Sequence, residues 1–510
     1  MKWPGLDLEF LPQSAPLPVF AATVTATQWS ALAVHVAASS GQLVTLWADS
    51  GRGPDSSISA AYQVSEGLLV VDLPLDDGTV YPDLGALFFP ARRLQRAVRD
   101  LSGVSAAGAG DRRPWLRHAA WPADWFPLVA NPGLTIPAAP GHDDYAFVEV
   151  EGEGVHEIPV GPVHAGIIEP GHFRFSVVGE KVLRLEQRLG YTHKGIAQRF
   201  VGLDLESAAR LAARVSGDST VAYGWACAMA AEGLTGAVPD RAQWLRAVLL
   251  ERERVANHLG DLGALGNDAA FGFAQTQFSM LREDWQRLNH AVFGHRLLMD
   301  VVVPGGVAVD IDDFWINELR RQHEEVRMGV SRLRRIFDEH AGLQDRLVTT
   351  GRINLAVARR LGLTGMAARA SGIARDLRAD YPWPPYATLG CRCITQHGGD
   401  VAARVAQRFD ELFEALRLLD RLLLTMPPGP ALIEAAAARG RRGFGWIEGW
   451  RGPVLVVLET ADDGRIVRGH CHDPSWQNWP ALEYAVLGNI VADFPLINKS
   501  FNLSYAGHDV

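Results

Sequence analysis

The first part of the chain alternates apolar and polar positions in short runs. Between residues 20 and 90, runs such as "SALAVHVAASSGQLVTLWAD" and "GLLVVDLPLDDGTVYPDLGALFF" are broken by Gly, Asp and Ser. A period of two with such breaks predicts strands joined by turns. The segment "ARRLQRAVRDL" at 91–101 has a helical pattern. The sequence therefore predicts a small α+β domain over residues 1–128, followed by a linker rich in Pro and Gly at 129–144.

Residues 145–510 begin and end with strand patterns and are helical between them. "YAFVEVEGEGVHEIPVGPVH" and "HFRFSVVGEKVLRLEQRLGY" alternate, and so does "PVLVVLETADDGRIVRGH" near the end, with a hairpin turn at "ADDG". From about 203 to 430 the apolar positions recur every three or four residues, which predicts helices, most clearly at 240–264 and 402–424. Asp240, after Pro239, suits the N-cap of the first of these. The fold class is α+β, with a mainly helical second domain that has small sheets near its start and end.

A short polar turn interrupts the helical region. "RVSGDST" at 214–220 places Ser216 and Ser219 three residues apart between two apolar segments. The same spacing recurs for Ser475 and Asn478 in "DPSWQN". The repeated spacing calls for an explanation beyond loop chemistry.

A polar stripe follows one face of the helix predicted at 240–264. Glu251, Arg254 and His258 share this face because they lie three and four residues apart, and Asn257 lies beside them. The stripe is either a solvated charged face or a buried polar network, and a buried network has to be fully hydrogen-bonded. The pattern does not choose between the two.

Three further segments carry candidate chemistry. "GPVHAGIIEPGHFRF" places His164 and His172 in one connection rich in Gly and Pro, where imidazoles could exchange protons near neutral pH. "EGWRGP" places Arg451 either in a tight hairpin or where it could reach a ligand. "GHCHDPSW" concentrates His470, Cys471, His472 and Asp473, a weak metal site without converging ligands.

Composition and charge exclude several classes of protein. A net charge of −9 and a pI near 6.0 argue against a nucleic-acid partner. The four cysteines form no C-x-x-C pair, so zinc knuckles and iron–sulfur clusters lack their usual ligands. The start lacks the features of a signal peptide, and no apolar run is long enough to span a bilayer. We therefore expect a soluble, cytoplasmic chain that reaches a membrane only through partner subunits.

Collinear segments over about residues 80–510 resemble the large subunit of nickel–iron hydrogenases and its relative in complex I. The resemblance is to the hydrogenase-4 and formate-hydrogenlyase type, in which the C-type and D-type proteins of complex I are fused into one chain. The segments that carry it include "IPVGPVHAGIIEPGHFRF", "LERERVANHLGDLGALGNDAAF", "GGDVAARVAQRFDEL" and "DPSWQNWPALEYAVLGNIVADFPLINKSFN". It implies a C-type domain at 1–128 and a D-type domain, like the large subunit, at 145–510.

The resemblance also explains the two spaced pairs. Active hydrogenases of this type carry C-G-x-C where "SGDS" stands here, and D-P-C-x-x-C where "DPSWQN" stands. Hydroxyl and amide oxygens are poor donors for a soft metal, so the resemblance implies that the chain binds no nickel–iron centre. The four degenerate ligand positions are Ser216, Ser219, Ser475 and Asn478.

The complex I side of the resemblance is incomplete as well. Its large subunit has a quinone-binding tyrosine next to this turn, whereas Gly217 stands here and Tyr223 is the nearest phenol. His164 matches the histidine of the loop that lines the same cavity. The resemblance thus points to the hydrogenase-related complexes whose large subunits lack the metal ligands.

Two main hypotheses follow for function. In the first, the chain is an oxidoreductase subunit that binds no cofactor itself. It packs against an iron–sulfur small subunit and couples electron transfer, with quinone as a candidate acceptor, to ion movement through membrane subunits of the antiporter-like and H-type kinds, on the cytoplasmic face of the inner membrane. In the second it is a structural and coupling module without a substrate. A hydrogenase with unusual ligands is a third reading.

The first hypothesis assigns roles to individual residues. His164 and Asp218 would exchange protons, and Arg451 would stabilise negative charge on a reduced acceptor. The residues expected beside the acceptor are His172, Gly217, Tyr223 and Ser475.

Overall fold

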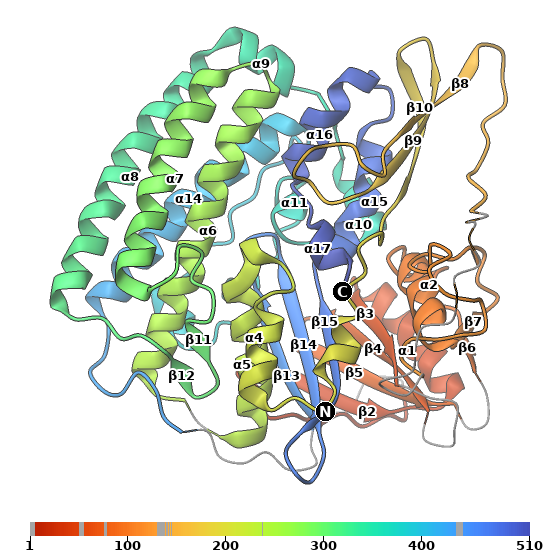
Figure 1. Ribbon diagram of the computed structural model, residues 1–510, viewed down its shortest axis with the longest axis horizontal. Helices are drawn as coiled ribbons and strands as arrows, with labels where there is room; N and C mark the ends of the chain where they lie inside the picture. Colours follow the sequence, from red (N-terminus) through yellow and green to blue (C-terminus); the bar gives the residue numbers. More distant parts are fainter. Residues whose placement is uncertain are drawn as a thin grey trace.

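The computed structural model describes residues 6–49, 56–75, 79–129, 138, 141, 143, 145–236, 238–434 and 442–510. Figure 1 shows a first sheet at one side, a group of long helices at the other, and the last strands of the chain between them. The predicted α+β class, with a mainly helical second part that has small sheets near its start and end, is confirmed. The predicted linker at 129–144 falls for the most part outside the described residues.

The first sheet has five strands in the order β1-β2-β5-β4-β3. All neighbours are antiparallel except β2 and β5, which run parallel in register Val19↔Leu68. Its core is apolar because β4 and β5 are buried along nearly their whole length. The strands are β1 Leu11–Pro12, β2 Val19–Thr23, β3 Gln42–Ala48, β4 Ser57–Val64 and β5 Gly67–Pro74.

The strand prediction is wrong for one segment of this region. "ATQWSALAVHVAA" forms the helix α1 (Ala26–Ala38), not a strand. Thr25 and Gln28 form a capping box, in which Gln28 N donates to Thr25 Oγ1 (3.3 Å) and Thr25 N donates to Gln28 Oε1 (2.9 Å). The alternation was misleading because alanine, which favours helices, occupies the small positions of both patterns.

The helix predicted at 91–101 is confirmed as α2 (Ala91–Ser102). It ends at Gly103, whose positive φ of 77° suits glycine at that position. Two short parallel strands flank α2, namely β6 Val80–Pro82 and β7 Ser105–Ala107. This arrangement places the arginine-rich face of α2 next to the start of the second part of the chain.

The second part of the chain begins with a small antiparallel sheet in the order β10-β9-β8. Its strands are β8 Val155–Val160, β9 His172–Val178 and β10 Lys181–Arg188. The predicted strand pattern is confirmed there, although residues 145–150 remain outside any strand. His164 lies in the long β8–β9 connection and His172 is the first residue of β9.

Helices dominate the middle of the chain, as predicted. Four long helices, α6, α7, α8 and α14, pack side by side (Figure 1). A small hairpin, β11 Val302–Val303 with β12 Gly306–Val307, interrupts them. The helices of this region are α3 Ile196–Phe200, α4 Leu205–Ala212, α5 Thr220–Thr235, α6 Asp240–Asp268, α7 Gly272–Phe293, α8 Asp313–Glu339, α9 Ala341–Leu347, α10 Leu355–Leu361, α11 Gly365–Arg369, α12 Leu377–Asp380, α13 Tyr386–Leu389 and α14 Val401–Leu424.

Both helices predicted by range in this region are present, with one error at an end. Asp240 is the first helical residue of α6 and not its N-cap, which is Pro239 without a side-chain cap bond. An aspartate in the first turn still interacts favourably with the helix dipole. The prediction was off by one residue because aspartate is common at both positions.

The last part of the chain returns to strands and ends in short helices. β13 Arg442–Glu448, β14 Pro453–Thr460 and β15 Ile466–His472 form an antiparallel sheet, and the predicted "ADDG" turn joins β14 to β15. Glycines in β13 let α5 approach closely, since a Cβ on Gly445 would lie 1.7 Å from Ala226 O. The helices that follow are α15 Ser475–Ala485, α16 Phe494–Phe501 and α17 Tyr505–His508.

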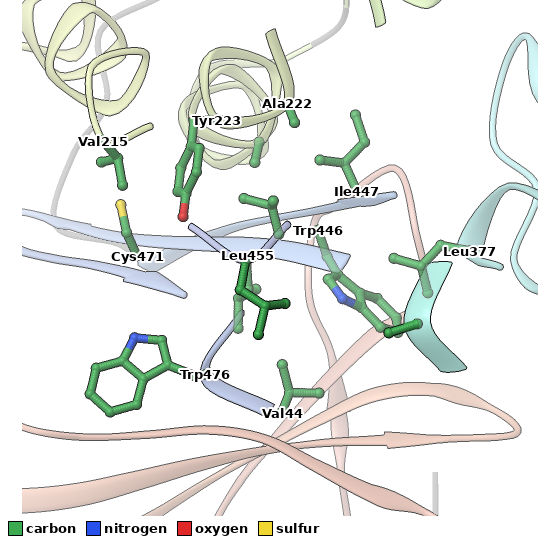
Figure 2. Close-up of a cluster of buried hydrophobic side chains, with 14 of the residues drawn as sticks. Val44, Val215, Ala222, Tyr223, Leu377, Trp446, Ile447, Leu455, Cys471 and Trp476 are labelled. Carbon is green, nitrogen blue, oxygen red and sulfur yellow. The ribbon is translucent and has the colours of Figure 1, made fainter. Parts of the chain in front are cut away.

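The core joins these layers. Figure 2 shows Ala222 and Tyr223 of α5 above the last sheet, Leu455 within that sheet, and Val44 of the first sheet below it. All four side chains are buried. The last sheet is therefore covered on both faces, which holds the two segments that follow its strands, at 449–452 and 473–478, in fixed positions. No described helix combines the length and apolar composition that a membrane crossing requires.

Candidate functional site

The polar turn of the sequence lies between α4 and α5. Residues Gly217–Ser219 form a single 3-10 turn, and Ser219 N donates to Ser216 O (2.9 Å). Gly217 is exposed, whereas Ser216 and Ser219 are buried. The turn thus presents one acidic side chain, that of Asp218, between a buried interior and the surface.

Arg451 reaches this turn from the hairpin between β13 and β14. Its guanidinium donates two bonds to Asp218, from Nη1 to Oδ1 (2.7 Å) and from Nη2 to Oδ2 (2.6 Å). The hairpin is tight, since Gly449 N donates to Gly452 O (2.9 Å). Both readings of "EGWRGP" therefore hold, because Arg451 sits in a tight hairpin and also contacts the predicted site.

Neighbouring groups fix this ion pair from several sides. The Asp218 carbonyl accepts from Asn257 Nδ2 (2.7 Å) and from Trp450 Nε1 (2.8 Å). Arg451 Nε donates to Asn502 O (2.6 Å), and its guanidinium lies 4.0 Å from the centre of the Trp450 ring. The Arg451 side chain is 6% exposed and that of Asp218 is 36% exposed, so water reaches the carboxylate but hardly the guanidinium.

The pKa of Asp218 is lower than usual. Burial by itself would raise this pKa, but the charge of Arg451 and the hydrogen bonds from Arg451 and Ser216 outweigh that effect. Asp218 is therefore ionised at neutral pH. A carboxylate held in this way orients a guanidinium well and exchanges protons poorly, which does not favour the proton role predicted for Asp218.

The four degenerate ligand positions are all buried and hydrogen-bonded within the chain. Ser216 Oγ lies 2.9 Å from Ser504 Oγ, and Ser504 N donates to Ser475 Oγ (2.9 Å). Ser219 Oγ accepts from Arg451 Nη1 (3.3 Å). Asn478 bonds both backbone groups of Thr364, with Thr364 N donating to its Oδ1 (3.0 Å) and its Nδ2 donating to Thr364 O (3.1 Å). These side chains act as structural hydrogen-bonding groups.

These residues do not fit a nickel–iron centre. Neutral hydroxyl and amide groups replace the thiolates that a soft metal needs. Cys471 packs near Val215 in Figure 2, but burial raises its pKa to about 12, so the thiol stays neutral. Among the described residues no three His, Cys, Asp or Glu side chains are grouped so as to hold a metal ion.

Tyr223 faces the other side of the same region. Its hydroxyl donates to Asp473 Oδ2 (2.8 Å), and Asp473 Oδ1 accepts from Ser475 N (2.8 Å). The ring is fully buried, and burial raises the pKa of Tyr223 well above its usual value. Tyr223 therefore links α5 to the start of α15 and does not open onto the exposed rim at Gly217.

The two loop histidines occupy different places. His164 is half-buried, and its Nε2 lies 3.3 Å from the hydroxyl of Tyr505, next to Ser504 in sequence. His172 is buried, its Nδ1 lies 3.4 Å from Gly161 O, and its ring packs against Phe147. The structure thus links His164 to the serine cluster through one tyrosine, whereas His172 contacts none of the site residues named above.

The polar stripe of α6 is a buried network. Glu251, Arg254 and His258 are 0% exposed, which decides between the two readings of the sequence. Their partners come from distant segments, for example Arg378 Nη1, which donates to Glu251 Oε1 (2.9 Å), and Glu411, whose Oε2 lies 3.3 Å from His258 Nε2. We call this set, with Arg369, Asp376, Glu448 and Tyr386, the α6 network.

Several residues of the site were not found from the sequence. Ser504 connects Ser216 with Ser475, and Lys194 Nζ donates to Val215 O (2.5 Å) and to Ala506 O (2.7 Å), which ties the turn to the chain end. Asn502 and Trp450 fix Arg451 and Asp218. Only the tail "NLSYAGHDV", polar after an apolar helix, carried any signal.

Comparisons with known proteins agree with this geometry. The family model of the respiratory-chain NADH dehydrogenase 49-kDa subunit matches residues 270–443. Formate hydrogenlyase subunit 5 of Escherichia coli (strain K12) is 31% identical over 428 residues, which cover 81% of this chain and 74% of that protein. Hydrogenase-4 component G of the same organism is 31% identical over 427 residues, covering 81% and 73%.

A solved structure is also similar. A chain from the structure of the membrane-bound sulfane sulfur reductase, an archaeal respiratory membrane complex, has a TM-score of 0.66 and 25% identity. The match covers 70% of this chain and 99% of that chain. The chain therefore belongs to the family that includes the 49-kDa subunit of respiratory-chain NADH dehydrogenase and the large subunits of the formate-hydrogenlyase and hydrogenase-4 type.

Proposed function

We propose that this chain is the large subunit of a membrane-associated oxidoreductase complex, related to complex I and to membrane-bound hydrogenases, that works without a nickel–iron centre. The observation that carries the proposal is the set of four positions Ser216, Ser219, Ser475 and Asn478, where neutral side chains are already hydrogen-bonded within the protein. A metal would have to break these bonds and would gain only weak donors.

The proposed partners follow from the family. An iron–sulfur small subunit would deliver electrons, and membrane subunits of the antiporter-like and H-type kinds would hold the complex at the cytoplasmic face of the inner membrane. The chain itself would bind no cofactor. Support comes from relatives that are subunits of hydrogenase complexes and from a structural neighbour in a respiratory membrane complex.

The exposed rim at Gly217 and Asp218 is the proposed place for an electron acceptor, with a quinone as one candidate. Arg451 lies directly behind this rim and would stabilise the negative charge of a reduced acceptor. Asp218 positions the guanidinium, and His164, beside Tyr505, is the remaining candidate for proton delivery.

One observation favours the second hypothesis, a coupling subunit without its own substrate. Tyr223 and the serine cluster are buried and their hydroxyl groups bond one another or nearby carboxylates. Such a cluster could transmit a shift of the turn to α15 and the chain end without binding a ligand. The two hypotheses differ in whether the rim residues affect turnover.

The test is a measurement on the purified complex. We expect less than stoichiometric nickel by elemental analysis, no hydrogen uptake or evolution, and turnover with one of quinone, ferredoxin or NADH. Arg451→Gln and His164→Gln should each lower that turnover, whereas Asp338→Asn on the exposed part of α8 should not. One nickel per chain together with hydrogen turnover would contradict the proposal. Unchanged turnover in both rim variants would support the coupling role instead.

A further inference from the structure

A second polar cavity lies away from the turn, where α2 meets β10 and the end of α15. Its volume is about 520 Å³, within the range of small-molecule sites. In Figure 1, α2 lies beneath the β9–β10 hairpin. Besides α2 and β10, the segment 111–115 lines the cavity, and Glu483 and Tyr484 close it from α15.

The lining of this cavity is rich in arginine. Five arginines face three carboxylates, which leaves an excess of two positive charges. The carboxylates are Asp111, Glu186 and Glu483, and the arginines are Arg92, Arg93, Arg96, Arg113 and Arg184. Since the chain as a whole has a net charge of −9, this concentration of positive charge is local and does not reflect overall composition.

The ion pairs inside the cavity leave part of the guanidinium groups without partners. Arg93 Nη2 pairs with Glu483 Oε1 (2.6 Å), but Arg93 Nη1 is buried and has no hydrogen-bond partner among the described residues. The same is true of Arg184 Nε, whose Nη2 lies 3.7 Å from Glu186 Oε2. A buried charged donor without an acceptor is costly, and an unassigned ion is one of the usual reasons for it.

Arg92 adds a third available cation. Its Nε donates to Gly85 O (3.1 Å), and no carboxylate of a described residue lies within ion-pair distance of its guanidinium. The Phe89 ring lies 4.8 Å below this guanidinium and packs edge-on against Tyr484, with ring centres 6.0 Å apart. The cavity therefore combines unpaired guanidinium donors with a wall of aromatic rings.

We propose that this cavity binds a small organic anion with two negative charges, of the phosphate-ester class. Guanidinium groups recognise phosphate oxygens through paired hydrogen bonds, and two negative charges would neutralise the excess in the lining. The aromatic wall would pack against a planar organic portion, and the volume leaves room for more than the phosphate group alone. The site lies outside the Asp218–Arg451 region and does not depend on the proposed function.

The probes are inorganic phosphate and adenosine monophosphate, tested on the full chain by calorimetric titration at constant ionic strength with chloride as the competing anion. We expect both to bind in the millimolar range or tighter, the nucleotide more tightly because of its planar base. Arg92→Gln and Arg184→Gln should each weaken binding roughly tenfold, because each removes a charged donor. Both side chains are partly or fully exposed, so these variants should fold.

Arg320→Gln provides the matched control, since it removes one positive charge from an exposed position of α8 far along the chain from the cavity. Binding by this variant should equal that of the wild type. The proposal is overturned if neither probe binds below about 10 mM. It is equally overturned if Arg320→Gln weakens binding as much as the cavity variants, because that result would indicate unspecific attraction.

Discussion

The turn at 216–219 and the α6 network both bury polar groups beside the same helix, yet by different means. At the turn, neutral hydroxyls surround one ion pair whose carboxylate is 36% exposed. In the network, charged side chains such as Arg254 and Arg369 are 0% exposed and several carboxylates surround them. A group at the turn can lose a partner and still reach water or a neighbour, whereas a member of the network cannot. The family's chemistry can therefore change at the turn while the network stays.

The largest expected effect is the loss of a charge from the network. Arg369 Nε donates to Glu411 Oε1 (2.8 Å) and its Nη1 donates to Glu448 Oε1 (2.7 Å). Arg369→Met would leave two buried carboxylates without this partner and should lower the free energy of unfolding by about 3–5 kcal/mol. Urea unfolding of the full chain, followed by tryptophan fluorescence, measures the change.

The control for this experiment is an ion pair on the surface. Arg321 of α8 pairs with Glu318 and Glu325, but its side chain is 58% exposed. Arg321→Met should change the free energy of unfolding by less than about 1 kcal/mol. Equal losses in the two variants would show that the network is no more sensitive than the surface.

The second prediction concerns Glu253, which connects α6 to the turn without joining the network. Val221 N donates to its Oε2 (2.6 Å), and burial raises the pKa of Glu253 from 4.5 to about 8. Between these two values the unfolded chain releases the proton that the folded chain keeps, so stability falls as pH rises through this window. Compared with Glu253→Gln, the wild type should lose roughly tenfold in its folding equilibrium constant per pH unit there.

Urea midpoints of both proteins at pH 5, 6, 7 and 8 would test this difference. Glu339→Gln, at the exposed end of α8, is the matched control and should follow the wild type at every pH. Parallel pH dependence of the wild type and Glu253→Gln would mean that Glu253 ionises normally in the folded protein.

The third prediction addresses the ion pair at the turn. Arg451→Met removes both bonds to Asp218 and the bond to Asn502 O, but the exposed carboxylate can bind water instead. We expect a loss of about 1–3 kcal/mol, smaller than for Arg369→Met. Combining it with Asp218→Asn in a double-mutant cycle should give a coupling energy within this range. A loss as large as that of Arg369→Met would remove the distinction between the two regions.

The sequence predicted those elements whose pattern has only one reading. The helices α2, α6 and α14 and the β14–β15 hairpin have a clear period with turn or helix-end signals, and they were found nearly to the residue. The helix α1 was missed because its alanines fit two periods, and its capping box at Thr25 and Gln28 was overlooked. Local pattern was therefore sufficient except where small residues made it ambiguous.

The site was predictable in its charged and spaced residues but not in its connections. Asp218 and Arg451 were both singled out, yet their bidentate contact joins residues 233 positions apart and depends on how the last sheet packs on α5. Ser504 had no distinguishing neighbour in sequence, although it bridges Ser216 and Ser475. His172 was assigned with His164 because they share a loop, but the start of β9 turns it toward Phe147. Such relations arise from tertiary packing and leave no periodic signal.

The smallest expected effect is the removal of one hydroxyl from the turn. Ser216 Oγ donates to Asp218 Oδ1 (2.9 Å) and also lies 2.9 Å from Ser504 Oγ. In Ser216→Ala, Asp218 keeps both bonds from Arg451, and Ser504 Oγ still accepts from Gly507 N (2.8 Å). No buried charge loses its only partner, so the loss should be about 1 kcal/mol.

Ser331→Ala on the exposed face of α8 sets the baseline for this measurement, with an expected change within about 0.5 kcal/mol. Ser216→Cys should cost no more than Ser216→Ala, because sulfur is a weak acceptor that replaces the hydroxyl without adding a buried charge. A loss above about 3 kcal/mol for Ser216→Ala would place the serine among groups as sensitive as Arg369. The turn would then be as constrained as the α6 network, and its departure from the ligands of its metal-binding relatives could not be explained by tolerance of the site.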